Sequence, residues 1–141
     1  MRYGYSLPEL MLVFALIAIL FGIALPGLSA ALDRIEVGTA ASHIAAAHAR
    51  ARLMAITQSK VIVLSVDSLA LTIRPRGYAT ALWSEAGPAS SGVSLAGSGQ
   101  TFTFSPAGFS LGLSNATLEL SRGTATRSVI VSRLGRVRIV R

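Results

Sequence analysis

The chain has 141 residues, which leaves room for one domain beyond a membrane anchor and makes a second sizeable domain unexpected. It contains no cysteine, which excludes disulfides and cysteine-based metal sites. The net charge of +7, carried by 12 arginines and one lysine against six acidic residues, falls entirely on residues 33–141 and favours a polyanion or acidic neighbours in an assembly as partners.

The amino terminus carries one carboxylate, Glu9, ahead of an uncharged run from Leu10 to Leu32. The run is long enough to cross a membrane, and burying an ionisable group at its start costs free energy unless a cation pairs with it. In a secretory signal the apolar core precedes the cleavage site, whereas here it follows Gly4. Cleavage after Gly4 would create an amine at Tyr5, one helical turn from Glu9. Such a pair is worth about 0.2–0.5 kcal/mol within a solvated helix, but between subunits in a dry bundle it would neutralise a buried charge.

The segment Gly4-Tyr5-Ser6-Leu7-Pro8-Glu9-Leu10 resembles the prepilin signature of type IV pilins and type II secretion pseudopilins, Gly-Phe-Thr-Leu-Ile-Glu-Leu. The changes of Phe to Tyr and Thr to Ser are conservative, and Pro8 suits a first helical turn, whose N–H groups have no partner to lose. The resemblance implies that a prepilin peptidase cuts after Gly4 and methylates the amine of Tyr5, and that Glu9 registers subunits during assembly. The alternative is an ordinary anchor helix with an incidental glutamate.

One long helix is predicted from about Ser6 to Ile56, roughly 75 Å at 1.5 Å per residue. Its first half is apolar all round, as in a membrane or bundle helix. Gly22 and Pro26 interrupt this half, and a proline removes a backbone hydrogen bond and clashes with the preceding turn, so we expect a kink or local melting there. The second half is amphipathic, which predicts a helix packed on a sheet. Its apolar stripe contains Val37, Ala40, Ala41, Ile44, Ala47, Ala51, Met54 and Ala55.

From Lys60 onward the pattern changes to period two with β-branched residues, which predicts an antiparallel sheet. Three short turns are predicted between neighbouring strands, at Asp67-Ser68, at residues 75–77 and at Arg122-Gly123. A Gly/Ala/Ser-rich segment from Ser84 to Gln100 is expected to be a mobile loop. The expected strands are residues 60–66, 69–74, 78–83, 101–104, 116–121, 127–132 and 136–140.

A long helix that leads into an antiparallel meander is an α+β plan, and the resemblance implies the type IV pilin fold. The head adds a second likeness, because Phe102-Thr103-Phe104-Ser105-Pro106-Ala107-Gly108 and the terminal strand with Gly135-Arg136-Val137-Arg138 are similar to the GspH/FimT group of minor pilins, whose heads end in a Gly-Arg-x-Arg strand. The expected organisation is a leader peptide (residues 1–4), a transmembrane and assembly helix (residues 5–32) and a periplasmic or extracellular head (residues 33–141).

The chain offers no catalytic set. His43 and His48 are five residues apart on the predicted helix, which is not the i, i+4 spacing of a helical metal pair. Asp67 and Glu85 fall at predicted turns and have no histidine or nucleophile at a suggestive spacing. We therefore expect a protein that is not an enzyme and that needs neither a metal nor a cofactor.

The arginines of the terminal strand are the remaining candidate for a binding site. Arg136 and Arg138 should project from one face about 6.6 Å apart, with Val137 and Ile139 toward the core, after a tight turn at Gly135. Two guanidinium groups can hold phosphates bidentately through salt-sensitive contacts, and the resemblance to FimT-like pilins of competent bacteria implies that such a motif binds double-stranded DNA. The alternatives are a solvated face, pairing with acidic neighbours, or a charged edge that discourages strand pairing. Further arginines that could widen the patch are Arg122, Arg127, Arg133 and Arg141.

These observations together predict a minor pilin or pseudopilin that assembles through its amino-terminal helix into a type IV pilus or a type II secretion pseudopilus, at the tip. A DNA receptor for natural transformation is the alternative as its main role. The partners implied are other pilins or pseudopilins, the inner-membrane assembly platform, the prepilin peptidase and double-stranded DNA. The expected location is the inner membrane, crossed once with the head in the periplasm, and then a filament that could reach the cell surface.

Overall fold

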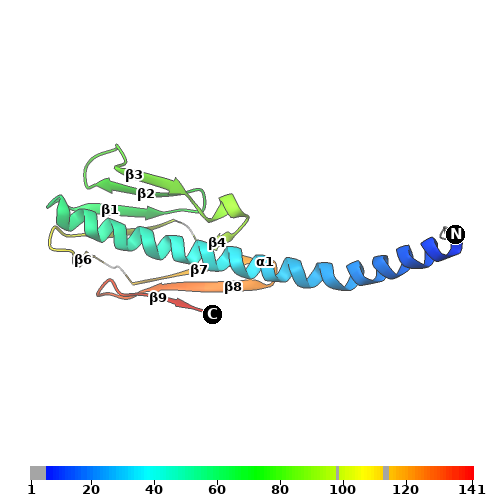
Figure 1. The fold of residues 1–141 in the computed structure, drawn as a ribbon. Coiled ribbons are helices and arrows are strands. Elements are labelled where there is room, and N and C mark those ends of the chain that lie inside the picture. The colour runs from blue at the N-terminus through cyan, green and yellow to red at the C-terminus, as the bar shows by residue number, and fades with distance from the viewer. Residues whose placement is uncertain (1–5, 98, 113–114) are drawn as a thin grey trace. The chain divides into compact units, whose positions relative to one another are not determined.

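A computed structural model of the protein describes residues 6–97, 99–112 and 115–141. The chain forms two compact units, residues 1–32 and residues 33–141. One α-helix, α1 (Leu7–Thr57), contributes residues to both units (Figure 1). The helix predicted from Ser6 to Ile56 is therefore confirmed to within one residue at each end. Its helical assignment continues through Gly22 and Pro26, and the kink expected there stays a prediction.

The first unit consists, in its described part, of the amino-terminal half of α1. Its large apolar side chains are exposed, as at Phe14, Leu20 and Ile23. By length and composition α1 is able to cross a membrane. An exposed apolar surface of this kind is unfavourable in water, so this half of the helix needs lipid or other protein around it.

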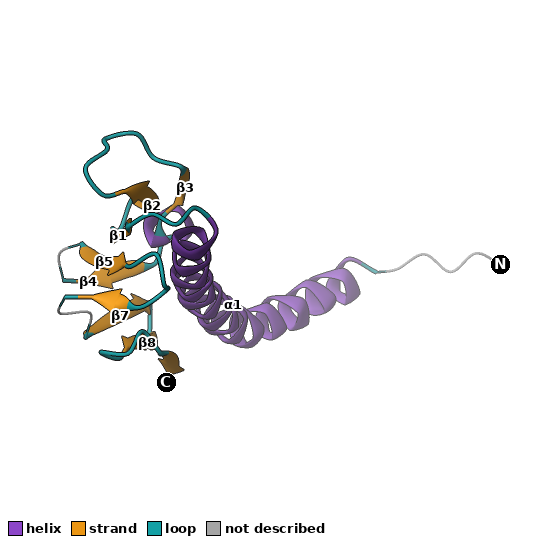
Figure 2. Ribbon diagram, turned by 90° about the vertical axis from the view of Figure 1, so that its left-hand side faces the viewer, coloured by secondary structure: helices purple, strands orange, loops and turns teal. Residues whose placement is uncertain are grey.

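The second unit is built from the rest of α1 and two antiparallel sheets. One sheet has the strand order β3-β2-β1-β5-β6 and the other has the order β4-β7-β8-β9. Figure 2 shows the strands ranged along one side of α1. The fold class is confirmed as α+β, with the strands divided between two sheets. The strand bounds are β1 (Ile62–Val66), β2 (Ala70–Pro75), β3 (Trp83–Ala86), β4 (Ser94–Ala96), β5 (Gln100–Phe104), β6 (Ser110–Leu111), β7 (Ala116–Arg122), β8 (Ala125–Val131) and β9 (Val137–Val140).

The core lies between α1 and the two sheets. Alanines dominate the buried helical face, which lets the helix backbone approach the sheets closely, and larger residues from the strands fill the remaining space. The predicted apolar stripe of α1 is buried except for Met54, which is half-buried against the core. The largest fully buried side chains in the strands include Phe104, Ile62, Leu64, Leu71, Ile73, Leu118 and Leu120.

The segment from Ser84 to Gln100 differs from the single loop that its composition suggested. It contains the end of β3, a 3-10 helix η1 (Pro88–Ser91) and β4. Gly87 lies against the β1–β2 turn, where its N–H donates to the carbonyl oxygen of Leu69 at 2.9 Å. A Cβ at Gly87 would collide with the carbonyl oxygen of Ser68. The glycine was therefore not a sign of an irregular loop, since it permits a close backbone contact that docks this segment.

The third strand also differs from its prediction, because it begins at Trp83 instead of Tyr78. β3 pairs with β2 from Ala70↔Ala86 to Ile73↔Trp83. Pro75 has no N–H to donate, so the far end of β2 offers less to a neighbouring strand. The connection after β2 is consequently longer than the three-residue turn expected at residues 75–77.

Candidate functional site

The amino-terminal site begins at Ser6, because Gly4 and Tyr5, the predicted cleavage site, lie outside the described residues. The Ser6 carbonyl accepts hydrogen bonds from the N–H groups of Glu9 at 3.0 Å and Leu10 at 3.2 Å, which makes Ser6 the residue that caps α1. The Glu9 side chain reaches back, and its Oε2 accepts a long 3.5 Å hydrogen bond from the Ser6 N–H. This is the glutamate half of a capping box, a role that the Ser-x-x-Glu spacing carries in the sequence.

Glu9 is exposed, and it is the one charged residue between Gly4 and Leu32. Its carboxylate lies in the first turn of α1, where the helix dipole favours a negative charge. Within the described part of this unit no cation neutralises it. The apolar surface that follows would have to be buried together with this charge, so a partner that buries the helix must also supply a positive group.

A tight turn joins β8 to β9, the terminal strand of the head, and two hydrogen bonds between Ser132 and Arg136 close it. Ser132 accepts at its side-chain oxygen a 3.1 Å hydrogen bond from the Arg136 N–H, and the Ser132 N–H donates to the Arg136 carbonyl at 2.9 Å. Gly135 adopts a φ of 75°, and a Cβ there would come within 2.6 Å of the Ser110 Oγ. The turn therefore requires glycine at this position for both its conformation and its contact with β6.

β9 forms one edge of its sheet, where it pairs with β8. Ile139 lies opposite Val129, a core residue, and Arg138 lies opposite Ile130. Because side chains alternate between the faces of a strand, Arg138 lies on the face away from the core. Arg136, in the turn just before β9, is exposed, as is Arg138.

The other arginines predicted to widen this patch are divided between different places. Arg122 forms an ion pair with Asp33, Nε to Oδ1 3.0 Å, and Arg133 lies exposed in the β8–β9 turn. Arg127 is on the same side of β8 as the core residue Val129, so it points toward α1. The arginines of the carboxyl-terminal region thus occupy two faces of the sheet.

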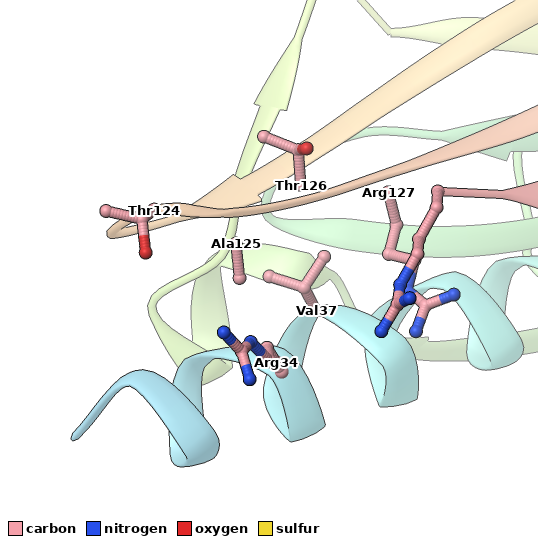
Figure 3. Close-up of a pocket in the computed structure, with 7 residues that line it drawn as sticks. Arg34, Val37, Thr124, Ala125, Thr126 and Arg127 are labelled. Carbon is pink, nitrogen blue, oxygen red and sulfur yellow. The ribbon is translucent and has the colours of Figure 1, made fainter. Parts of the chain in front are cut away.

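A groove of about 510 Å³ collects three of the chain's arginines between α1 and the β7–β8 hairpin (Figure 3). The guanidinium groups of Arg34 from α1 and Arg127 from β8 point into it in Figure 3, and Arg141 completes the set. The remaining lining residues are Val37, Thr124, Ala125 and Thr126. The sequence analysis did not connect Arg34 with Arg127. Two signals were available: Arg34 lies just after the uncharged run, and Arg127 is two residues from Val129, so that both side chains lie on the same face of the strand.

His48 is buried in the head, with 3% of its surface exposed. Its ring packs edge-on against Phe102 and Phe104, with centroids 5.6 Å and 4.9 Å away, and its Nε2 has no hydrogen-bond partner within the described residues. Burial, and then the charge of Arg52, lower the pKa of His48 from its usual 6.5. A neutral histidine with this packing serves the core of the head.

His43 has a partner that the sequence spacing did not suggest. Its Nδ1 lies 2.8 Å from the Glu85 Oε1, which joins α1 to β3. Beside this pair the guanidinium of Arg50 lies 5.0 Å from the centroid of the Trp83 ring. Both side chains of the His43–Glu85 pair are substantially exposed, so the contact fastens the edge of the sheet to the helix weakly. No group of three His, Cys, Asp or Glu residues that could hold a metal occurs in the described part of the chain.

Comparison with known proteins gives matches to a family model, to a relative and to solved structures. A family model described as type II transport protein GspH matches residues 40–135. The pilin-like protein PilA1 of Thermus thermophilus is 31% identical, over 98% of this chain and 98% of its own length.

Two crystal structures of the type IV minor pilin FimU of Pseudomonas aeruginosa share the fold. One has a TM-score of 0.62 at 20% identity and covers 77% of this chain and 90% of FimU. The other has a TM-score of 0.57 at 18% identity and covers 74% and 92% of the respective chains. At these identities the likeness concerns the fold of the head and of its helix.

Proposed function

Because the chain belongs to the GspH family and is a type IV pilin-like minor pilin or pseudopilin, we propose that it is a structural subunit placed at the tip of a type IV pilus or a type II secretion pseudopilus. Pilins are assembly proteins, so its partners are other pilins or pseudopilins. We further propose that residues 5–32 anchor it in the inner membrane in a single pass, with residues 33–141 in the periplasm, before the assembly platform moves it into the filament and toward the cell surface.

The observation that carries the proposal is the exposed apolar half of α1 with one carboxylate at its start. In a bundle of such helices Glu9 would be buried, and a positive group nearby would be required. Cleavage after Gly4 by a prepilin peptidase supplies one in the methylated amine of Tyr5. A neighbouring subunit could then present that amine to Glu9 and set the axial register of the two helices.

The test separates the charge of Glu9 from its capping role. Glu9→Gln keeps an oxygen that can accept from the Ser6 N–H, since glutamine also completes a capping box, but it removes the charge. We expect this variant and Glu9→Ala to be processed normally and to be poorly incorporated in a pull-down of assembled filaments. Gly4→Glu should block processing altogether. Normal incorporation of Glu9→Gln would show that the cap suffices and that the charge-pairing argument is wrong.

DNA binding is a second candidate function, as in a receptor for natural transformation. It is supported by the exposure of Arg136 and Arg138 beside an edge strand, where nothing in the described structure neutralises them. The protein would be titrated with fluorescent double-stranded DNA at two salt concentrations. Loss of a salt-sensitive affinity in Arg136→Ala/Arg138→Ala would support this function.

A matched control keeps the charge change constant. Arg74 and Arg76 are two exposed arginines at the end of β2, and Arg74→Ala/Arg76→Ala removes the same two charges. If this control weakens binding as much as the terminal pair does, the effect is one of net charge and the terminal motif is not a DNA site. Absence of binding at low salt would leave the structural role alone.

A further inference from the structure

We propose that the groove formed by Arg34, Arg127 and Arg141 binds the phosphate of an anionic phospholipid headgroup while the subunit resides in the membrane. The inference rests on the membrane insertion proposed above and adds a ligand to it. The groove lies wholly in the second unit, and its lining residues come from α1, from the β7–β8 hairpin and from the residue that follows β9.

The charges of the groove are uncompensated. Three arginines line it and no acidic side chain does, among the residues that the structure describes. The nearest carboxylate in sequence, Asp33, is engaged by Arg122 at 3.0 Å. Glu36, the next one, lines a different hollow together with His43. The groove therefore carries a positive potential that an anion would relieve.

The donors match a phosphate group. Guanidinium groups present paired N–H donors in a planar fork that fits phosphate oxygens, and these charge-assisted bonds are stronger than neutral ones. Thr124 adds a hydroxyl group that points toward α1 in Figure 3. Arg34 and Arg127 come from different elements that the core holds together, so both line the groove before a ligand arrives.

The position along the chain selects a membrane source for this phosphate. Arg34 follows Leu32, the last residue of the uncharged run, by two residues, or about 3 Å along a helix. A headgroup layer is about 5–8 Å thick on each side of a hydrocarbon core of about 30 Å. If the run from Leu10 to Leu32 spans that core, Arg34 lies within the layer of lipid phosphates.

The surroundings of the groove also suit an amphipathic ligand better than a nucleic acid. A second hollow of about 560 Å³ shares Arg34 and Arg127 and is lined by Ile35 and Ile139. These isoleucines are 61% and 41% exposed. Arginine beside exposed aliphatic side chains offers a phosphate contact and an apolar contact at once, which a phospholipid can satisfy and a DNA backbone cannot.

The test measures lipid retention by the full chain released from maltoside micelles, by native mass spectrometry. Dihexanoyl-phosphatidylglycerol is the anionic probe, and dihexanoyl-phosphatidylcholine and inorganic phosphate are the comparisons. We expect the anionic lipid to bind roughly tenfold more tightly than either comparison, and Arg34→Gln/Arg127→Gln to weaken its binding roughly tenfold or more. The charge-matched control Arg74→Gln/Arg76→Gln should change it less than about twofold.

Several results would overturn the inference. Equal lipid affinity in the groove variant and the control would show that the groove is not the site. Inorganic phosphate binding as tightly as the lipid would make the free ion the ligand, and a short DNA duplex retained through Arg34 and Arg127 would make it a nucleic-acid site. Alkaline extraction of cell membranes tests insertion separately. A chain that stays in the membrane but whose groove ignores lipid refutes this inference alone, whereas a chain released by alkali refutes the proposed anchoring.

Discussion

Replacing Gly135 by alanine tests whether the β8–β9 turn depends on glycine for two separate physical reasons. The residue has a φ of 75°, a left-handed conformation that costs an L-residue about 1–2 kcal/mol. The new Cβ would also lie 2.6 Å from the Ser110 Oγ. The serine hydroxyl can rotate away, so this clash should add about 1 kcal/mol, the lower end of the usual range for overpacking. The expected loss is about 2–3 kcal/mol.

Two further variants separate the two terms. Gly77 has a similar φ of 86° and nothing within 4 Å of its Cβ position, so Gly77→Ala should cost the conformational term alone, about 1–2 kcal/mol. Ser110→Ala removes the clashing oxygen and leaves a Cβ at 3.8 Å, an ordinary contact. In that background Gly135→Ala should cost about as much as Gly77→Ala does.

The assay is urea unfolding of the full chain in maltoside micelles, followed by the fluorescence of Trp83. It is the one tryptophan of the chain and lies in β3, so it reports on the head. Free energies come from the midpoints and slopes of the transitions. The reasoning is refuted if Gly135→Ala costs no more than Gly77→Ala, or if Ser110→Ala does not reduce the cost.

Three other predictions use the same assay. Because burial and Arg52 lower the pKa of His48, the folded state takes up a proton at this histidine less readily than the unfolded state does. The free energy of unfolding should therefore be full above pH 6.5 and fall as the pH drops below it. His48→Leu should lose this pH dependence, and a dependence that persists in the variant would exclude His48 as its source. Arg122 pairs with Asp33 at 3.0 Å and donates to the Ser91 carbonyl at 2.6 Å, so Arg122→Ala should cost about 1–2 kcal/mol, and an unchanged midpoint would mean that both contacts are negligible. Phe104 is fully buried and packs on His48, so Phe104→Ala should cost about 3–5 kcal/mol, and a loss below about 1 kcal/mol would contradict the assigned core.

The long helix and the fold class could be predicted from the sequence because their signals are local. An uncharged run and an alanine-rich stripe at helical spacing define α1, a short β-branched apolar run indicates β1, and alternation defines β7. The family was recognised from the motif around Glu9 and the two motifs of the head, and the matches to GspH and PilA1 confirm it. Such signals depend on neighbours a few residues apart, which the chain order already supplies.

Composition misled where a residue serves a distant contact. The glycine-rich stretch after β3 suggested a loop, yet Gly87 permits a close backbone contact with the β1–β2 turn that a side chain would block. In the same way Glu85 had no histidine nearby in the sequence, although folding brings His43 within 2.8 Å. Contacts of this kind depend on which strands pair and how they cross the helix, and no local pattern encodes that arrangement.

By itself, the sequence determined the membrane-length helix, the placement of its single carboxylate, the α+β plan and the positive charge of the head. Only the tertiary structure decided how that charge is distributed. The pairing of β8 and β9 turns Arg138 outward and directs Arg127 toward α1, where it lines a groove with Arg34 from nearly a hundred residues earlier in the chain. The physical reason is that a strand's alternation is visible in the sequence, whereas the element that each face meets is fixed only by long-range packing.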